Sequence, residues 1–486
     1  MRRIRRTVAA TMTGMFALGL AACGGNADTG GTAAGGGTTV VEDDTVVVEE
    51  AGTGEDCGTT EIEVVGLLPG SDPAAIAALE EQAQQFMDAN PDIIVDVVEY
   101  HWQATTFAAQ LAGGTLPDVF EIPFTDAQTL IQNGQLANMD AQFRTLPYAD
   151  LFNPDILAAG EDASGQVYAI PAMNVYGVGL HYNRELFESA GLDPDSPPTS
   201  WDQVREYAKA IADANPGVAG YMQMSQNNTG GWQLTVQNYA RGGRVQELHD
   251  DGTATATIND PATLEALQWL HDMRWEDNSL GSNFLMDWGT INQAFASGQI
   301  AMFTSGSDVY TSMVQTNNID PAMYGLAALP LNDDPNAGVL TGGTLAAVPA
   351  GRDACIKDAA IKWIDFRYTG KLIDEAAAVQ DARTLFEAGQ PVGTPVLPMF
   401  SEEQWRENQE WIADYINVPL DQMSSYIDAM FDQKLVGEPS RDTQEFYALM
   451  DPVVQAVLTD EHADIPALLE QANTQAQALL DASNPS

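Results

Sequence analysis

Residues 61–100 read EIEVVGLLPGSDPAAIAALEEQAQQFMDANPDIIVDVVEY, and this stretch decides the fold. Its apolar opening is typical of a strand, and Asp72-Pro73 then starts a helix with one apolar face. After the break at Asn90-Pro91, apolar and polar residues alternate, as they do in a half-buried strand. A strand, a helix and a second strand in this order predict a parallel or mixed sheet with helices on both faces. The sequence therefore predicts an α/β fold.

The same alternation continues along the chain. A helix predicted at 126–134 ends at Gly134, which suits the left-handed C′ position. Further strands are predicted at 116–123, 324–330 and 343–350. From Ser401 onward the pattern is helical throughout.

The N-terminus has the pattern of an export signal. Residues 1–7, MRRIRRT, carry four arginines, and residues 8–22 contain no charge. This pattern predicts a signal peptide over residues 1–22. The end of the apolar run, LAAC at 20–23, resembles a bacterial lipobox, in which Cys23 would be lipidated and become the mature N-terminus. Ordinary cleavage, with Cys23 as an incidental thiol, is the alternative.

Residues 23–58 are rich in Gly, Thr, Ala, Asp and Glu and contain no aromatic residue. Such a composition buries too little apolar surface to fold, so we expect a flexible acidic linker. With a lipid-modified Cys23, the folded part would be tethered to the outer face of the cell membrane. The chain is thus expected to be extracytoplasmic.

The composition limits the partners and the domain count. The net charge is −49, from 20 basic and 69 acidic side chains, so nucleic acid and anionic lipid surfaces are repelled. The part of the chain after the linker exceeds the usual size of one compact core, which predicts two domains.

Two cysteines remain besides Cys23. Cys57 precedes the first predicted strand and Cys355 begins a helix far downstream. In an oxidising compartment, two such thiols predict one disulfide, and two buried unpaired thiols are the alternative.

Seven segments occur in an order that indicates a family. They are LAGGTLPDVFEI, AIPAMNVYGVGLHYNRELFESAGL, SWDQVREYAKAI, GGWQLTVQNYARGG, INQAFASGQIAMFTSGSD, YGLAALPL and TGGTLAAVPAG. Together they resemble the extracellular solute-binding proteins of family 1, which include the maltose-binding protein and related sugar receptors of ABC importers. The resemblance extends from about Glu61 to the C-terminus.

The resemblance implies a type II periplasmic-binding-protein fold, with two α/β domains, crossover hinges and a ligand cleft between them. We expect residues 59–172 and 326–370 in the first domain, and residues 173–325 and 371–486 in the second. The implied function is capture of a sugar or oligosaccharide by a monomer that closes at its hinge and delivers the ligand to ABC permease subunits. A polyamine or another small polar solute is the alternative ligand.

The resemblance also implies site residues. Glu121 and Phe124 follow a strand at the edge where α/β sheets bind ligands, although Phe124 could instead only seal the domain edge. Asn174 and Tyr176 lie on the first crossover, and hinge packing is the other interpretation of Tyr176. Trp232 is expected to offer a flat ring to the apolar face of a sugar, unless it belongs to the core.

Six further residues complete the implied site. They are Asn228, Asp287, Trp288 and Asp308, with polar or aromatic side chains, and Gly342 and Gly343, where backbone amides can approach a ligand closely.

The sequence offers little support for catalysis. The five histidines, at 101, 181, 249, 271 and 462, have no metal-binding spacing. We find no G-x-S-x-G, no P-loop and no G-x-G-x-x-G after a strand. We therefore expect a binding protein without cofactor or metal rather than an enzyme. A secreted carbohydrate-active hydrolase is the alternative from another class.

Overall fold

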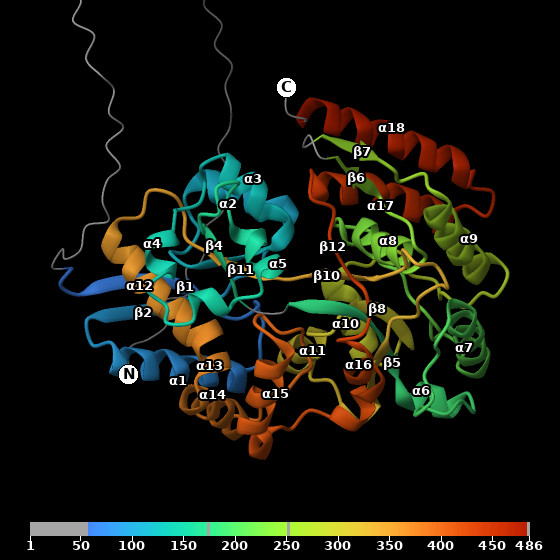
Figure 1. The fold of residues 1–486 in the computed structure, drawn as a ribbon. Helices are drawn as coiled ribbons and strands as arrows, with labels where there is room; N and C mark the ends of the chain where they lie inside the picture. Colours follow the sequence, from blue (N-terminus) through green and yellow to red (C-terminus); the bar gives the residue numbers. More distant parts are fainter. Residues whose placement is uncertain (1–56, 173–174, 250–252, 484–486) are drawn as a thin grey trace, which may run out of the picture. The chain divides into compact units, whose positions relative to one another are not determined.

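A computed structural model describes residues 57–172, 175–249 and 253–483, which form a mixed α/β structure (Figure 1). The predicted α/β class is confirmed. The predicted signal peptide, Cys23 and nearly all of the predicted linker lie outside the described residues.

The opening βαβ unit is present as predicted. β1 (Thr60–Val65) pairs in parallel with β2 (Ile93–Val98) over their whole length. α1 (Pro73–Ala89) connects them, and the Asp72 carboxylate accepts hydrogen bonds from the first backbone N–H groups of the helix. The apolar face of α1 packs on the strands because Phe86 and its neighbours one turn apart are buried.

A second, three-stranded sheet adjoins this unit. β11 (Thr344–Ala347) lies between β3 (Phe120–Pro123) and β4 (Ala169–Pro171), antiparallel to both. A bridge between Val64 and Val119 links β1 to the chain just before β3. α2 (Ala104–Gly113) precedes β3, and α3 (Phe124–Gln132) follows it directly. We call these two sheets and their helices the first side.

The largest sheet is centred on β5 (Tyr176–Asn183), which is almost entirely buried. It pairs antiparallel with β8 (Met302–Gly306), β9 (Tyr324–Ala328) and β10 (Val339–Gly342). We call this sheet and its helices the second side.

The edge of this sheet corrects one prediction. β12 (Leu435–Gly437) pairs in parallel with β10, although residues after Ser401 were expected to be helical throughout. Three residues are too few to show an alternating pattern in the sequence. The strand forms because its backbone pairs with β10.

Four helices cover one part of the second side. α8 (Thr229–Ala240), α9 (Pro261–Trp275), α17 (Thr443–Thr459) and α18 (Ile465–Ser483) pack against one another. α8 and α17 are in close contact because Gly231 has no side chain: a Cβ there would collide with the Tyr447 carbonyl. Helices almost 200 residues apart in sequence thus form one layer.

The chain stays on the first side after β11. α12 (Ala354–Ile364), α13 (Gly370–Ile373), α14 (Glu375–Glu387) and α15 (Glu402–Trp411) follow in order. The Gln82 amide of α1 donates a 2.6 Å hydrogen bond to Asp381 of α14. In Figure 1 these orange helices accordingly lie beside the blue α1, β1 and β2.

Shorter elements complete the fold. The remaining helices and strands are α4 (Asp140–Phe143), α5 (Pro154–Leu157), α6 (Arg184–Ser189), α7 (Trp201–Ala214), β6 (Gln246–Leu248), β7 (Ala254–Ala256), α10 (Trp288–Ala296), α11 (Val309–Asn317) and α16 (Ser424–Ala429). Five 3₁₀ turns span Ala149–Leu151, Ala158–Gly160, Pro321–Met323, Ala413–Tyr415 and Leu420–Met423, and one π-helical turn spans Asp365–Thr369.

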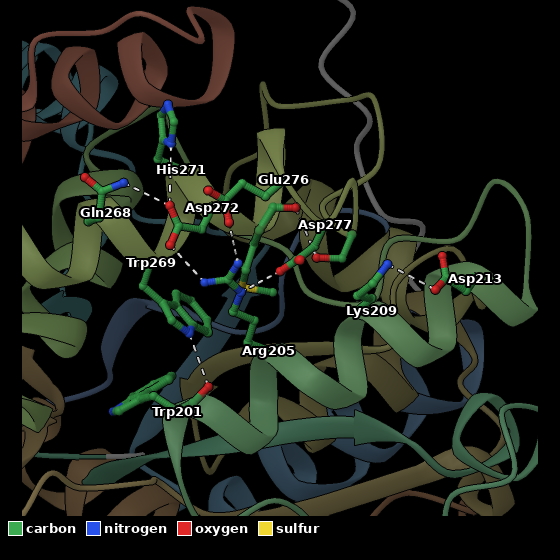
Figure 2. A network of polar contacts seen from close by, with 12 residues as sticks. Trp201, Arg205, Lys209, Asp213, Gln268, Trp269, His271, Asp272, Glu276 and Asp277 are labelled. Atoms are coloured by element: carbon green, nitrogen blue, oxygen red, sulfur yellow. Dashed lines mark hydrogen bonds and ion pairs between the residues drawn. The ribbon is translucent and has the colours of Figure 1, made fainter.

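One arginine forms ion pairs with several acidic residues of the second side (Figure 2). Arg205 of α7 contacts Asp272, Glu276 and Asp277 at and beyond the end of α9, at 2.8, 3.0 and 2.5 Å. Next to it, the Trp269 indole donates to the Trp201 carbonyl. The network joins α7 to α9, which is a structural role.

The predicted disulfide is confirmed. Cys57 and Cys355 are bonded, with 5.6 Å between their Cα atoms, so the bond ties the start of β1 to the start of α12.

The expected domain boundaries stay a prediction. Residues 326–342, assigned above to the first domain, include most of β9 and all of β10, which pair with β5. Residues 375–411, assigned to the second, include α14, which hydrogen-bonds to α1. In the part of the chain that the structure describes, no helix is long and apolar enough to cross a membrane.

Candidate functional site

Four side chains from three separate segments meet on the second side. Tyr176 begins β5, Trp232 lies on α8, Glu438 follows β12, and Tyr447 lies on α17. The Tyr176 and Trp232 rings meet edge to face, with centroids 6.3 Å apart. The Tyr447 hydroxyl donates a 2.9 Å hydrogen bond to Glu438 Oε1. Tyr176, Trp232 and Glu438 are half-buried, so they also border open space.

Gly342 and Gly343 allow this arrangement. A Cβ at Gly342 would lie 2.6 Å from the Tyr176 hydroxyl and 2.7 Å from Glu438 Oε2. A Cβ at Gly343 would lie 2.6 Å from the Phe124 ring. Any side chain at either position would displace these groups. The close packing of these groups against the backbone therefore requires glycine at both positions.

Asp308 reaches the same cluster from the start of α11. A Cβ at Gly306 would touch both the Asp308 carboxylate and, at 2.9 Å, Tyr176 Cγ, so both side chains pack closely against that glycine. Among the described residues, no basic side chain forms an ion pair with Asp308.

The first side contributes a wall around the start of α3. The Trp102 indole donates a 2.8 Å hydrogen bond to Asp126, and Asp126 is close enough to Glu438 to raise the pKa of that carboxyl. Phe124 is anchored because its backbone N–H donates to the Gly343 carbonyl at 3.0 Å. α3 therefore begins where the chain crosses from β10 to β11.

Glu121 lies further back on this wall. Its Oε1 accepts a 2.7 Å hydrogen bond from the hydroxyl of Tyr368, which lies in the π-helical turn. The Tyr100 hydroxyl, near Glu121 and Asp126, is buried without a hydrogen-bond partner among the described residues.

One glutamine connects the two walls directly. Gln444 of α17 donates a 2.9 Å hydrogen bond to Thr125 of α3, and its Oε1 accepts one of 3.0 Å from Asn228. Nearby, the His101 and Trp288 rings are 6.3 Å apart, which brings the loop after β2 to the start of α10. The two walls thus touch at these contacts, and we call the site between them the cleft.

Burial disfavours ionisation of the acidic side chains of the cleft. Removal from water raises the pKa of Asp126, Asp308 and Glu438 to about 7 in each case. Burial also raises the pKa of Glu121, while the Tyr368 hydrogen bond and Arg367 act in the opposite direction. Near neutral pH these carboxyls can both accept and donate hydrogen bonds.

The cleft contains hardly any positive charge. No described lysine or arginine forms an ion pair with Glu121, Asp126, Asp308 or Glu438. Aromatic faces and carboxyl groups suit a neutral or cationic polar ligand. They do not suit an anion. In the residues described, no group of three or more His, Cys, Asp or Glu side chains could hold a metal ion.

Some predicted site residues have other roles in the structure. Asp287 caps α10, accepts from Thr290, and also accepts a 2.8 Å bond from the Asn227 amide. Asn228, in a left-handed conformation, precedes α8, and its backbone N–H donates to Asp451 of α17 at 2.8 Å. Asn174 lies outside the described residues. The other predicted residues stay predictions as ligand contacts, and the structure groups most of them around Tyr176.

Sequence reasoning did not find Glu438, Tyr447, Gln444, Asp126 or Trp102. Glu438 and Tyr447 lie in the region predicted to be helical throughout, where no pattern marks a site. Asp126 lies two residues after Phe124, a predicted ligand contact, so extending the predicted site by two residues would have included it.

A groove of about 960 Å³ adjoins the cluster. The groove and the cluster share Phe124, Thr125 and Glu438 at their border. The groove alone is also lined by Val175 and Thr341. Side chains alternate along a strand, so Val175 and Thr341 point away from Tyr176 and Gly342. The groove therefore lies behind the crossover strands.

Comparison with curated proteins gives a distant match. The sn-glycerol-3-phosphate-binding periplasmic protein UgpB of Salmonella typhimurium is 24% identical over 306 residues, which cover 59% of this chain and 66% of the relative. The chain thus spans just under two thirds of the length of this curated relative.

Solved structures show the fold. An ABC transporter solute-binding protein from Thermotoga lettingae, bound with alpha-D-tagatose, superimposes with a TM-score of 0.69 at 18% identity, over 87% of this chain and 100% of the other. The substrate-binding protein Lmo0181 of Listeria monocytogenes, in complex with cycloalternan, gives 0.67 at 20% identity, over 87% and 99%. The predicted type II periplasmic-binding-protein fold is confirmed.

The family itself is identified by a continuous match. Residues 70–369, more than half of the chain, match the family described as bacterial extracellular solute-binding protein. This match confirms the resemblance seen in the sequence. The protein belongs to the bacterial extracellular solute-binding protein family.

Proposed function

We propose that this protein is the substrate-binding subunit of an ABC importer, and that it captures a sugar or oligosaccharide in the cleft around Tyr176. The observation that carries the proposal is the cluster of Tyr176, Trp232, Tyr447 and Glu438, in which aromatic rings surround a hydrogen-bonding carboxyl group. A pyranose ring has an apolar C–H face and a rim of hydroxyls. An aromatic face covers the first, and carboxyl groups bind the second.

The charge of the cleft favours some candidate ligands over others. The curated relative is named for sn-glycerol-3-phosphate, a dianionic solute near neutral pH. Four acidic side chains without an ion-paired lysine or arginine would repel a phosphate. We therefore propose a neutral sugar for this chain, as in the solved relatives with tagatose and cycloalternan.

The same acidic groups support a second candidate. An organic cation such as a polyamine would be attracted to Glu121, Asp126, Asp308 and Glu438 and would also bind over aromatic rings. A polyamine stays the alternative within the same binding function. A catalytic function has no comparable support, because the family is one of solute-binding proteins.

Capture would proceed by closure. Two crossings of the chain, near Tyr176 and at Gly342-Gly343, connect the two sides and are the proposed hinge. Ligand contacts from both walls would stabilise the closed form over an open one. The closed monomer would then dock on the permease subunits, which release the ligand into the transport path.

The proposal extends to the residues that precede the fold. A signal peptide over 1–22 would direct export, and a lipid on Cys23 would hold the protein on the outer face of the cell membrane. Residues 23–58 would act as the tether between lipid and fold. The family is extracellular, which supports this location.

A ligand screen tests the proposal. We expect mono- or oligosaccharides to raise the melting temperature, and glycerol 3-phosphate to have no effect. Trp232→Ala should weaken the binding of an active sugar about tenfold or more, whereas Trp411→Ala, a half-buried tryptophan of α15, should not. Stabilisation by spermidine but by no sugar would favour the polyamine. Release of reducing ends from oligosaccharides would contradict a pure receptor.

Small-angle scattering tests closure separately. Saturating ligand should reduce the radius of gyration of the protein. If a ligand binds tightly and leaves it unchanged, capture does not involve closure.

A further inference from the structure

The π-helical turn at Asp365–Thr369 interrupts the passage from α12 to α13. Its backbone bond runs from the Gly370 N–H to the Asp365 carbonyl, five residues back instead of four. Such turns are rare, well under 1% of residues, and they often occur at functional sites because the extra residue redirects the side chains of that turn.

Specific contacts hold this turn. The Tyr148 hydroxyl donates to the Asp365 carboxylate and lies 2.8 Å from the Thr369 hydroxyl, so one tyrosine contacts both ends of the turn. Gly370 permits the geometry, since a Cβ there would lie 2.5 Å from Asp365 Oδ1. The turn is therefore fixed by its surroundings.

The turn directs Tyr368 toward the first wall of the cleft. Tyr368 is 2% exposed, and its hydroxyl donates a 2.7 Å hydrogen bond to Glu121 Oε1. Glu121 lies on β3, the strand that leads into Phe124 and Asp126. Among the described residues, no group donates a hydrogen bond to Glu121 Oε2, so one oxygen is held and the other is available.

The charged and titratable groups around Glu121 come from two segments. Tyr100 lies beyond β2, and Arg367 and Tyr368 belong to the turn. Burial raises the pKa of Glu121, while the Tyr368 hydrogen bond and then Arg367 lower it. The hydroxyl of Tyr368 thus favours the ionised carboxylate, the form that accepts hydrogen bonds.

We propose that Tyr368 is a positioning residue of the binding site: it holds Glu121 through Oε1, so that Oε2 accepts a hydrogen bond from the captured ligand. The proposal rests on the function proposed above, since it requires that the cleft binds a polar solute. It assigns the π-helical turn a role in ligand recognition.

The first test is the titration of Glu121 itself, followed by carboxyl ¹³C NMR in the full folded chain. Tyr368→Phe should move the titration midpoint of Glu121 to higher pH. Tyr182→Phe is the matched control, since Tyr182 is also 2% exposed and its hydroxyl donates a single bond, to the Pro194 carbonyl. An unchanged midpoint in Tyr368→Phe would overturn the proposal.

The second test is affinity, measured by calorimetry with maltotriose and with spermidine as probes. For a probe that binds, Tyr368→Phe should raise Kd about tenfold at pH 7, the usual size of one lost bond to a charged group. The loss should shrink as the pH is raised, which a packing defect would not do. In a Glu121→Gln background the same substitution should change Kd less than twofold.

The outcomes separate the two proposals. Equal affinity of wild type and Tyr368→Phe for a bound probe overturns the positioning role and leaves the receptor function intact. Binding of neither probe, nor of any sugar in the earlier screen, overturns the receptor function and with it the role of Tyr368.

Discussion

The two walls of the cleft are built in different ways. On the first wall, Trp102 and Asp126 are 24 residues apart, with only α2 and β3 between them. On the second wall, Trp232 and Tyr447 are placed by contacts between α8 and α17, and Asp451 accepts hydrogen bonds from Asn228 and Gly231 more than 200 residues earlier. The Trp102–Asp126 contact of the first wall is therefore short-range in sequence, whereas the contacts that place Trp232 and Tyr447 on the second wall are long-range.

The difference affects stability as well as function. The first side is closed covalently by Cys57–Cys355, whereas the helices of the second side are joined by packing, hydrogen bonds and ion pairs. A loop closed over 298 residues restricts the unfolded chain strongly. We therefore expect substitutions on the two sides to affect stability and ligand affinity to different degrees.

The largest effect should follow loss of the disulfide. Replacing both Cys57 and Cys355 by serine should lower the free energy of unfolding by about 2–5 kcal/mol. Ligand affinity should not change, because the bond is surrounded by Thr59–Glu61 and Asp353–Ile356 rather than by the cleft residues. Urea denaturation and calorimetry measure the two quantities. A large loss of affinity would show that the bond also shapes the cleft.

The next effect should come from Asp451. Asp451→Ala leaves two backbone donors of α8 without an acceptor in a buried position, which should cost about 2–4 kcal/mol. Because α8 carries Trp232, affinity should fall together with stability. Asp464→Ala, which removes a bond at the exposed start of α18, is the control and should have a much smaller effect. Full affinity in Asp451→Ala would contradict long-range placement of Trp232.

Glu438→Gln should have a smaller effect that depends on pH. The pKa of Glu438 is raised from 4.5 to about 7 in the folded protein, so the folded state binds a proton that the unfolded state loses between these values. Stability is therefore lost as the pH rises through this window, and the loss is complete above pH 7. The substitution should raise stability at pH 8 by about 1–2 kcal/mol, allowing for partial exposure.

The matching measurement is urea denaturation at pH 4 and pH 8. At pH 4 the two proteins should be equally stable, because the carboxyl is then neutral in both states. The exposed Glu247→Gln serves as the control. A variant less stable than wild type at pH 8 would refute the raised pKa.

The smallest effect should come from Gln444, the contact between the walls. Gln444→Ala removes hydrogen bonds to Thr125 and Asn228, each worth about 1 kcal/mol or less at a partly exposed site. The ligand-free protein should become more open, with a larger radius of gyration, while the melting temperature hardly changes. Gln84→Ala on α1 is the control, since its amide contacts only Asp88 of the same helix. An unchanged radius would show that this contact does not hold the walls together.

Prediction from sequence succeeded where the local pattern was long. The βαβ unit at 61–100, the cap at Asp72 and the strands at 324–330 and 343–350 follow from periodicity and capping residues. It failed at β12, whose three residues form a strand only because β10 lies beside them. Glu438 was missed for the same reason.

The sequence by itself determined the α/β class, the family, the acidic charge and two residues of the first wall, Glu121 and Phe124, because these depend on composition, periodicity and short-range order. Only the tertiary structure decided that Tyr176, Glu438 and Tyr447 share one site, since their approach requires glycines at 231 and 342 and strands paired across more than 150 residues. It also decided that Tyr368 reaches Glu121. Contacts between distant segments have no local signature, because their free energy arises from surfaces that meet only in the folded chain.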